Sequence, residues 1–343
     1  MRQQPSLEAE VIATLAALTP LTVIGRTSDS TWLEVRTPFL EYGWVSAEFL
    51  ELFISVTDIP VIWRPDLSPQ VDDSPEGETP TESPPESYPY VSGLTDHLRE
   101  IYQLGQSLGN GANVFSKVGD SITVNSGFLN VFGTRHYALH EYGYLQGVIE
   151  HYESGWARTH NPFANVSLAA GVGWTSLHMV QSDLADAELC GVDESPLECE
   201  YRHVRPSLAI IMLGTNDVPS MPSEIFESSM RQIIEISLEQ GIIPLVSTIP
   251  PMHRSGMEAR VAAFNAMLAD LAEEYQVPLV DYWSSLLALP NQGIGSDGVH
   301  PTNAPGQDDG NLSAANLEYG IPVRNLTTLQ ALDAIWRMVM LEE

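Results

Sequence analysis

From about residue 91 onward, nearly continuous apolar runs break off at polar residues and are separated by segments of helical periodicity. The apolar runs lie in ANVFSKVGD (112–120), LAIIMLGTND (208–217), IIPLVSTIPP (242–251) and VPLVDYW (277–283). Runs that are apolar on both faces are typical of strands in a parallel sheet covered by helices on both sides. We therefore predict an α/β domain over residues 91–343.

The segments between these runs carry apolar residues at helical spacing. Phe226, Met230 and Ile233 share one face of a predicted helix, and Gly241 after it is a typical helix-stop signal. The C-terminal segment NLTTLQALDAIWRMV (325–339) predicts a closing amphipathic helix whose leucines face inward. Strands and helices thus alternate up to the end of the chain.

Before residue 56 the pattern changes to short runs of period two that are separated by turn residues. The alternation is clearest in TWLEVR (31–36), and it predicts a small β-barrel or meander over residues 1–55. Residues 56–90 are rich in proline, serine and acids, with too few apolar residues to offset the entropy of ordering. We predict an extended, semi-rigid linker there.

The 343 residues carry a formal net charge of −30. No basic stripe exists to displace counterions from phosphates, so nucleic acid is excluded as the expected partner, and anionic lipid is disfavoured. No stretch approaches the roughly 20 apolar residues that a membrane span requires. The first ten residues, MRQQPSLEAE, are polar and do not resemble a signal peptide. We expect a secreted or cell-surface protein whose leader has been removed.

The chain has two cysteines, Cys190 and Cys199, within a polar segment. No histidine or further cysteine stands beside them at metal-ligand spacing, so we predict no metal site there. A disulfide that closes a small loop is the favoured interpretation, and it indicates an oxidising compartment. Two reduced, unrelated thiols are the alternative.

Three short polar motifs carry candidate chemistry. Gly119-Asp120-Ser121 ends the first strand of the α/β domain, GTND (214–217) follows the LAIIML run, and DGVHP (297–301) lies in a late loop. In open parallel sheets the active site forms outside the carboxyl ends of the strands. We therefore expect the three motifs to meet at one edge of the sheet.

A serine hydroxyl needs a base within hydrogen-bond reach to act as a nucleophile at neutral pH. For Ser121 the best candidate is His300, and Asp297 can accept its Nδ1 proton and leave Nε2 to face the serine. Acyl transfer also needs donors for the developing oxyanion. We expect them in the N–H of Ser121 at a predicted helix start, the Asn216 carboxamide, and a backbone N–H of the glycine loop AAGVGWTS (169–176).

These motifs, in this order, resemble the four blocks of the SGNH hydrolases, also called the GDSL lipase/acylhydrolase superfamily. The resemblance covers about residues 91–343 and implies a flavodoxin-like three-layer α/β/α sandwich. It implies Ser121 as nucleophile, His300 as base and Asp297 as its orienting acid. It also implies an oxyanion hole from the Ser121 N–H, the Gly173 N–H and the Asn216 side chain, with Gly171 as the alternative glycine.

The N-terminal zone resembles a bacterial SH3 domain. PSLEAEVIATL (5–15), LTVIGR (21–26), WLEVR (32–36) and GWVSAEFL (43–50) stand in the expected order, although the usual first strand is nearly absent. The resemblance implies an SH3-like β-barrel that binds a cell-wall or peptide ligand or braces the catalytic domain.

The favoured function is a serine esterase that hydrolyses a small-molecule or polymer ester through an acyl-enzyme, without metal or cofactor. One alternative is a carbohydrate O-deacetylase that acts on cell-wall or plant polysaccharide. Another is an inactive surface-binding protein with a hydrolase fold. Asp120, Trp174 and His160 are further candidates for residues that line the substrate pocket.

Overall fold

The computed structural model describes residues 84–341 without a gap and, before them, residues 1–2, 5–7, 9, 11–15, 19, 21–36, 42–50, 52, 56 and 61–63. The chain divides into two compact units, and each is described here by itself. Most of the predicted linker, residues 57–60 and 64–83, lies outside the described part of the chain.

The N-terminal unit is built on an antiparallel sheet of β1 (Thr22–Thr27), β2 (Trp32–Arg36) and β3 (Tyr42–Ser46). Leu33 and Val35 alternate along β2 and form the centre of its small core. The period-two pattern therefore predicted these strands correctly, because alternate side chains of a strand point to the same face.

The ends of the predicted linker need correction. β4 (Val61–Trp63) pairs in parallel with β1, so the small sheet takes three residues from the segment that we assigned wholly to the linker. At the other end Tyr88 is buried, and its hydroxyl donates to Asp333 Oδ2 at 2.6 Å, within the larger unit. Composition averaged over the whole segment concealed both the short strand and the buried Tyr88.

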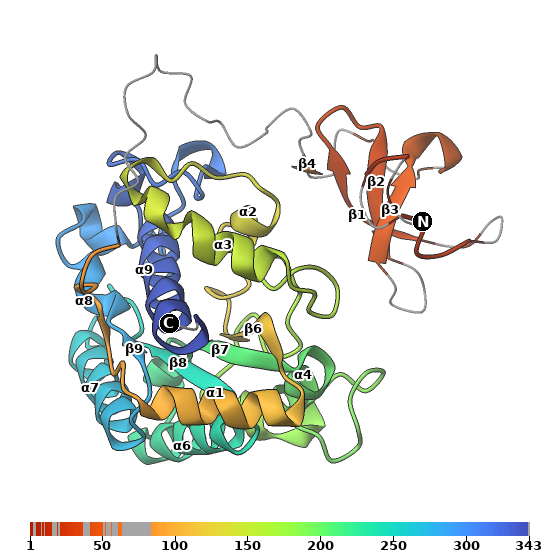
Figure 1. Ribbon diagram of the computed structural model, residues 1–343. Coiled ribbons are helices and arrows are strands. Elements are labelled where there is room, and N and C mark those ends of the chain that lie inside the picture. The colour runs from red at the N-terminus through yellow and green to blue at the C-terminus, as the bar shows by residue number, and fades with distance from the viewer. Residues whose placement is uncertain are drawn as a thin grey trace. The chain divides into compact units, whose positions relative to one another are not determined.

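The larger unit is organised around a five-stranded sheet in the order β5-β9-β8-β7-β6 (Figure 1). The strands from β6 to β9 are parallel, and β5 is an antiparallel edge strand. Every residue of β7 and β8 is buried, as expected for strands with helices on both faces. The bounds are β5 (Val91–Ser92), β6 (Gly111–Gly119), β7 (Pro206–Met212), β8 (Ile243–Ser247) and β9 (Leu279–Val280).

Helices cover both faces of this sheet and complete the predicted three layers. One face carries α1 (His97–Leu108), α3 (Gln146–Glu153) and α9 (Gly320–Ile335), and the other carries α4 (Pro196–Val204), α6 (Ser223–Glu239) and α7 (Glu258–Glu274). Among the described residues, no helix combines the length and apolar character needed to cross a bilayer. The shorter elements are α2 (Asn130–Gly133), α5 (Asp217–Ser220), α8 (Tyr282–Leu286), the 3₁₀ helices η1 (Ala47–Phe49), η3 (His140–Leu145), η4 (Ser176–Val180), η5 (Ser182–Leu184), η6 (Pro290–Gly293), η7 (Pro305–Gln307) and η8 (Asn316–Glu318), and the π-helical turn η9 (Trp336–Met340).

The prediction of an amphipathic closing helix is wrong. Helix α9 is buried on all sides, its polar residues included. These residues are tolerated because they hydrogen-bond inside the protein: Asn325, for example, donates to the carbonyls of Gly127 and Asp309 and accepts from the N–H of Leu129. The apolar spacing was therefore correct, but the opposite face meets protein instead of water.

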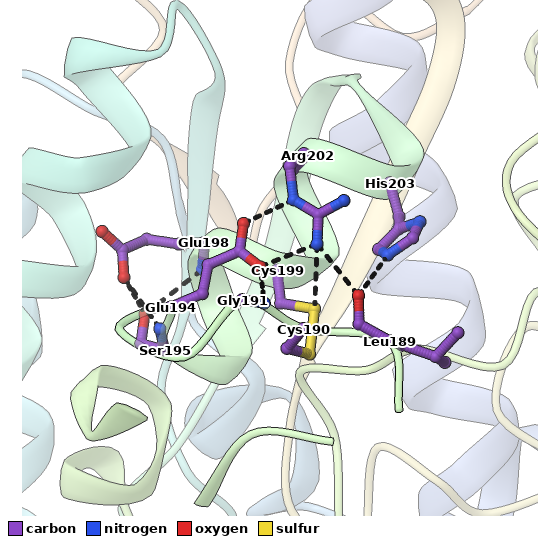
Figure 2. Close-up of polar contacts among 9 residues, drawn as sticks. All are labelled: Leu189, Cys190, Gly191, Glu194, Ser195, Glu198, Cys199, Arg202 and His203. Atoms are coloured by element: carbon purple, nitrogen blue, oxygen red, sulfur yellow. Dashed lines mark hydrogen bonds and ion pairs between the residues drawn. A yellow bond between two sulfur atoms is a disulfide. The ribbon is translucent and has the colours of Figure 1, made fainter. Parts of the chain in front are cut away.

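The predicted disulfide between Cys190 and Cys199 is present (Figure 2). It ties the loop before α4 to the first turns of that helix. Beside it, Arg202 donates to Glu194 Oε1 and Oε2 at 2.5 and 2.7 Å and to the carbonyl of Leu189 at 3.0 Å. The loop is thus held by one covalent bond and by one bidentate ion pair.

We expect Gly105→Ala to destabilise the protein. A Cβ at Gly105, inside α1, would lie 2.1 Å from the carbonyl oxygen of Gly241, which is backbone and cannot yield easily. The clash should outweigh the better helix propensity of alanine and cost about 1–3 kcal/mol. Urea unfolding measures it. Gly143→Ala is the control, because a Cβ there meets nothing within 4 Å. Equal midpoints for the two variants would contradict the packing argument.

We expect reduction of the disulfide to lower the free energy of unfolding by about 2–3 kcal/mol, because the bond closes a loop of nine residues in sequence separation and restricts the unfolded chain. Thermal unfolding with and without a reductant measures the change. The double variant Cys190→Ala/Cys199→Ala should have the stability of the reduced protein, and adding a reductant should not change that stability. A reduced protein as stable as the oxidised one would overturn this expectation.

Candidate active site

Ser121 lies two residues beyond the end of β6, in a single turn instead of at the start of a helix. The N–H groups of Thr123 and Val124 donate to the Asp120 carbonyl at 3.0 and 3.1 Å, and the chain then enters a second turn, in which Asn125 Oδ1 accepts from Gly127. The predicted helix is therefore absent, and with it the helix dipole. The turn-forming residues after Val124 end the helical backbone before it can propagate.

The late loop brings an imidazole and a carboxylate to this serine. His300 Nε2 lies 2.9 Å from Ser121 Oγ, and His300 Nδ1 lies 2.5 Å from Asp297 Oδ2. The other carboxylate oxygen of Asp297 accepts the N–H groups of Val299 and His300, each at 3.0 Å. The loop itself is closed by an isolated bridge between Ile294 and Pro301. Its backbone therefore fixes the orientation of both side chains.

The charge of Asp297 is well supported. Partial burial raises the pKa of its carboxyl. Hydrogen bonds from the His300 ring and from the N–H groups of Val299 and His300 lower the pKa by more than burial raises it, so that its value is about 2. Asp297 is thus ionised at neutral pH and holds a proton on His300 Nδ1. That tautomer leaves Nε2 as an acceptor for the Ser121 hydroxyl.

The glycine loop lies against the end of β6. Residues 169–171 form a parallel bridge with Gly119. The Gly119 N–H donates to the Ala169 carbonyl at 3.0 Å, and the Gly171 N–H donates to the Gly119 carbonyl at 3.2 Å. The Gly171 N–H is therefore occupied. Gly173 has φ of +79°, a conformation that favours glycine. Across residues 84–341, the N–H groups of Ser121 and Gly173 donate to no protein acceptor.

The GTND motif joins the end of β7 to the same glycine loop. Asn216 Nδ2 donates to the Trp174 carbonyl at 2.9 Å, which fixes the amide and leaves its second hydrogen for another acceptor. Asp217 is fully buried and accepts from the Ser176 N–H at 2.9 Å and from the Ser176 hydroxyl at 2.6 Å. Burial, opposed by these hydrogen bonds, raises the pKa of Asp217.

The three pocket candidates have different positions. Asp120 is fully buried behind the Ser121 turn, where Oδ1 accepts the Ile122 N–H at 2.9 Å; it offers no surface to a substrate, and its assignment to the pocket is wrong. The half-buried Trp174 stacks on His178 with ring centroids 6.0 Å apart. His160 Nδ1 lies 3.1 Å from Thr159 Oγ1. For Trp174 and His160 a role in the pocket stays a prediction.

Sequence reasoning missed two buried groups that hold the glycine loop and its approach. Glu200 of α4 is fully buried and accepts from the Leu168 N–H and the Ser116 hydroxyl, each at 2.8 Å. Lys117 of β6 donates from Nζ to the Phe163 carbonyl at 2.7 Å. Burial lowers the pKa of Lys117 to about 8. The only available signal was the presence of charged residues inside apolar patterns.

A third missed residue is Arg324 of α9, which is 2 % exposed. Its Nη1 donates to the Ile122 carbonyl at 2.7 Å, and its Nη2 donates to Thr123 Oγ1 at 3.0 Å. The only indication in the sequence was a single arginine in an otherwise uncharged part of the helix.

The model of the GDSL-like lipase/acylhydrolase family matches residues 118–305, and the model of the bacterial SH3 domain matches residues 1–51. Among the curated proteins, none matches the chain.

Solved structures that resemble the chain include a GDSL-like lipase from Bacteroides thetaiotaomicron, with 15% identity, a TM-score of 0.41, and coverage of 68% of this chain and 96% of that one. The esterase EstA from Pseudoalteromonas has 14% identity and a TM-score of 0.38, and the match covers 63% of this chain and 94% of EstA. The acetyl-xylooligosaccharide esterase Axe2 from Geobacillus has 19% identity and a TM-score of 0.38, and the match covers 68% of this chain and 95% of Axe2.

The family assignment depends on the family model, which spans more than half of the chain and includes the serine turn, the glycine loop, the GTND motif and the late loop. The chain therefore belongs to the GDSL-like lipase/acylhydrolase family and is a hydrolase of ester substrates that carries an N-terminal bacterial SH3 domain.

Proposed function

We propose that the protein is a serine esterase in which Ser121, His300 and Asp297 form the catalytic triad. The observation that carries the proposal is the unbroken chain of contacts from Ser121 Oγ to His300 Nε2 at 2.9 Å and from His300 Nδ1 to Asp297 Oδ2 at 2.5 Å. This is the spacing that general-base activation of a hydroxyl requires.

The reaction proceeds in two halves. As Ser121 Oγ attacks the ester carbonyl, its proton passes to His300 Nε2, and the resulting imidazolium is stabilised by the Asp297 carboxylate. The tetrahedral intermediate collapses, the C–O bond to the alcohol breaks, and His300 returns the proton to the departing alkoxide. Water then attacks the acyl-enzyme with the same imidazole as base, which releases the carboxylic acid and restores Ser121.

The oxyanion of each tetrahedral intermediate accepts from the N–H groups of Ser121 and Gly173 and from Asn216 Nδ2. Three features support this assignment over one that uses Gly171. The Gly171 N–H is bonded to Gly119, whereas the Gly173 N–H has no protein acceptor within residues 84–341. The carboxamide of Asn216 is held by the Trp174 carbonyl, next to Gly173 in the chain. Such donors, fixed before the reaction, are worth more than mobile ones.

We also propose that the protein acts outside the cell and that its SH3 domain binds a cell-wall or peptide ligand. The match of residues 1–51 to the bacterial SH3 domain and the disulfide support this proposal.

We expect Ser121→Ala to lower kcat for p-nitrophenyl acetate by at least about 10⁴-fold and Asp297→Asn to lower it by about 10⁴-fold, because the first removes the nucleophile and the second favours the wrong imidazole tautomer. Steady-state kinetics measure both. Ser126→Ala is the control, since Ser126 is exposed on the next turn. Full activity of Ser121→Ala would refute the triad.

The same preparations separate the alternatives. A fluorophosphonate probe labels an active serine hydrolase at Ser121, whereas an inactive surface-binding protein stays unlabelled. Faster turnover of acetylated glycans than of short p-nitrophenyl esters would identify a carbohydrate O-deacetylase. An ester panel of graded acyl length then defines the acyl preference.

We expect Asn216→Ala to lower kcat by about 10²–10³-fold with little change in KM, because the donor acts on charge that develops in the transition state. Asn113→Ala is the matched control: Asn113 also donates from Nδ2, to Ser154 Oγ at 2.9 Å, but on the partly buried amino-terminal part of β6, at the opposite end of the strand from Ser121. A change confined to KM would show that Asn216 binds the ground state instead.

A further inference from the structure

The Ser121 turn must be held by something other than a following helix. Its geometry decides whether the nucleophile stays 2.9 Å from His300 Nε2 and whether its N–H faces the oxyanion. A displacement of about 1 Å at a reacting group can cost about 10²-fold in rate. The contacts that fix the two peptide groups after Ser121 are therefore part of the machinery.

Two buried side chains of opposite charge fix these peptide groups. The N–H of the Ser121–Ile122 peptide donates to Asp120 Oδ1 at 2.9 Å. The carbonyl of the Ile122–Thr123 peptide accepts from Arg324 Nη1 at 2.7 Å, and Arg324 Nη2 reaches Thr123 Oγ1 at 3.0 Å. Asp120 belongs to the turn, but Arg324 lies about 200 residues later, on α9.

The position of the guanidinium is itself fixed. Its central carbon lies 3.5 Å from the centroid of the Phe128 ring, so the cation packs on an aromatic face. Burial lowers the pKa of Arg324 to about 10, which still leaves it charged at neutral pH. Burial raises the pKa of Asp120 to about 6, against the Ile122 N–H and the nearby Arg324 charge, which lower it.

A buried charge is costly unless hydrogen bonds and an opposite charge compensate it. A methionine of similar length would fill the same space more cheaply, so packing alone does not account for an arginine here. Unlike an apolar residue, Arg324 presents two directed donors, one to the Ile122 carbonyl and one to the Thr123 hydroxyl, directly after Ser121.

We propose that Arg324 is a positioning residue for the esterase reaction, which holds the Ser121 turn from behind so that the hydroxyl meets His300. The proposal rests on the function proposed above for Ser121. It assigns to the C-terminal helix a direct part in the geometry of the nucleophile.

The test compares Arg324→Met and Arg324→Lys with the unmodified protein, well below the Tm of each. We expect Arg324→Met to lower kcat for p-nitrophenyl acetate about 10²-fold, with KM within about threefold, and to slow labelling of Ser121 by a fluorophosphonate to the same extent. Arg324→Lys should recover part of both rates, because one ammonium can still donate to the Ile122 carbonyl.

Arg337→Met is the matched control. Arg337 follows in η9 and binds Asp333 Oδ2 at 2.8 Å and the Tyr144 carbonyl at 3.3 Å, with no contact to the Ser121 turn among the described residues. Its loss should lower Tm and leave kcat unchanged. Should Arg324→Met fail to fold, Thr123→Val removes the acceptor of Nη2 while keeping the charge, and it should lower kcat and the labelling rate together.

The outcomes are distinct. Wild-type kcat and labelling rate in folded Arg324→Met, or in Thr123→Val where only that variant folds, would overturn the positioning role while Ser121→Ala remained inactive. A loss of rate that follows only the unfolded fraction would overturn it as well. Full activity of Ser121→Ala would instead refute the proposed function itself.

Discussion

The parallel pairing of β6 with β7 is the constraint on which the site depends. Gly119 at the end of β6 stands opposite Met212 at the end of β7, so the residues that follow the two strands leave the sheet at the same edge. Ser121 comes two residues after the first and Asn216 four residues after the second. A shift of register by one residue would turn every side chain of β6 to the opposite face and would separate these groups.

At this edge of the sheet, buried carboxylates hold the glycine loop in place through hydrogen bonds. The glycine loop is fixed near its beginning by Glu200, which accepts the Leu168 N–H, and at its end by Asp217, which accepts from Ser176. Bonds between a carboxylate and backbone N–H groups are stronger than neutral ones. The loop therefore has little freedom between these points, which is what its proposed role as a source of oxyanion donors requires. Burying these carboxylates disfavours their charged form, and burial accordingly raises the pKa values of Glu200 and Asp217.

The sequence predicted the parts of the molecule that have a local pattern. Two apolar faces indicated β7 and β8, and helical spacing indicated α6. The order of the motifs along the chain allowed Ser121, Asp297 and His300 to be assigned to one site from the sequence alone. The role of Arg324 has no such pattern, because its partners Ile122 and Thr123 lie about 200 residues away. For the same reason, α9 was predicted to face water on one side: buried polar residues look like exposed ones until their hydrogen-bond partners are known.

The imidazole of His300 and the carboxylate of Asp297, which form the acid–base pair of the proposed triad, are accessible to solvent. The side chains of His300 and Asp297 are 48% and 49% exposed. Under the proposed mechanism, bulk solvent reaches the imidazole without the movement of a lid. Any small alcohol dissolved alongside water then competes for the acyl group on equal terms of access. We therefore expect the partition between hydrolysis and transesterification to follow the composition of the medium and the nucleophilicity of the acceptor.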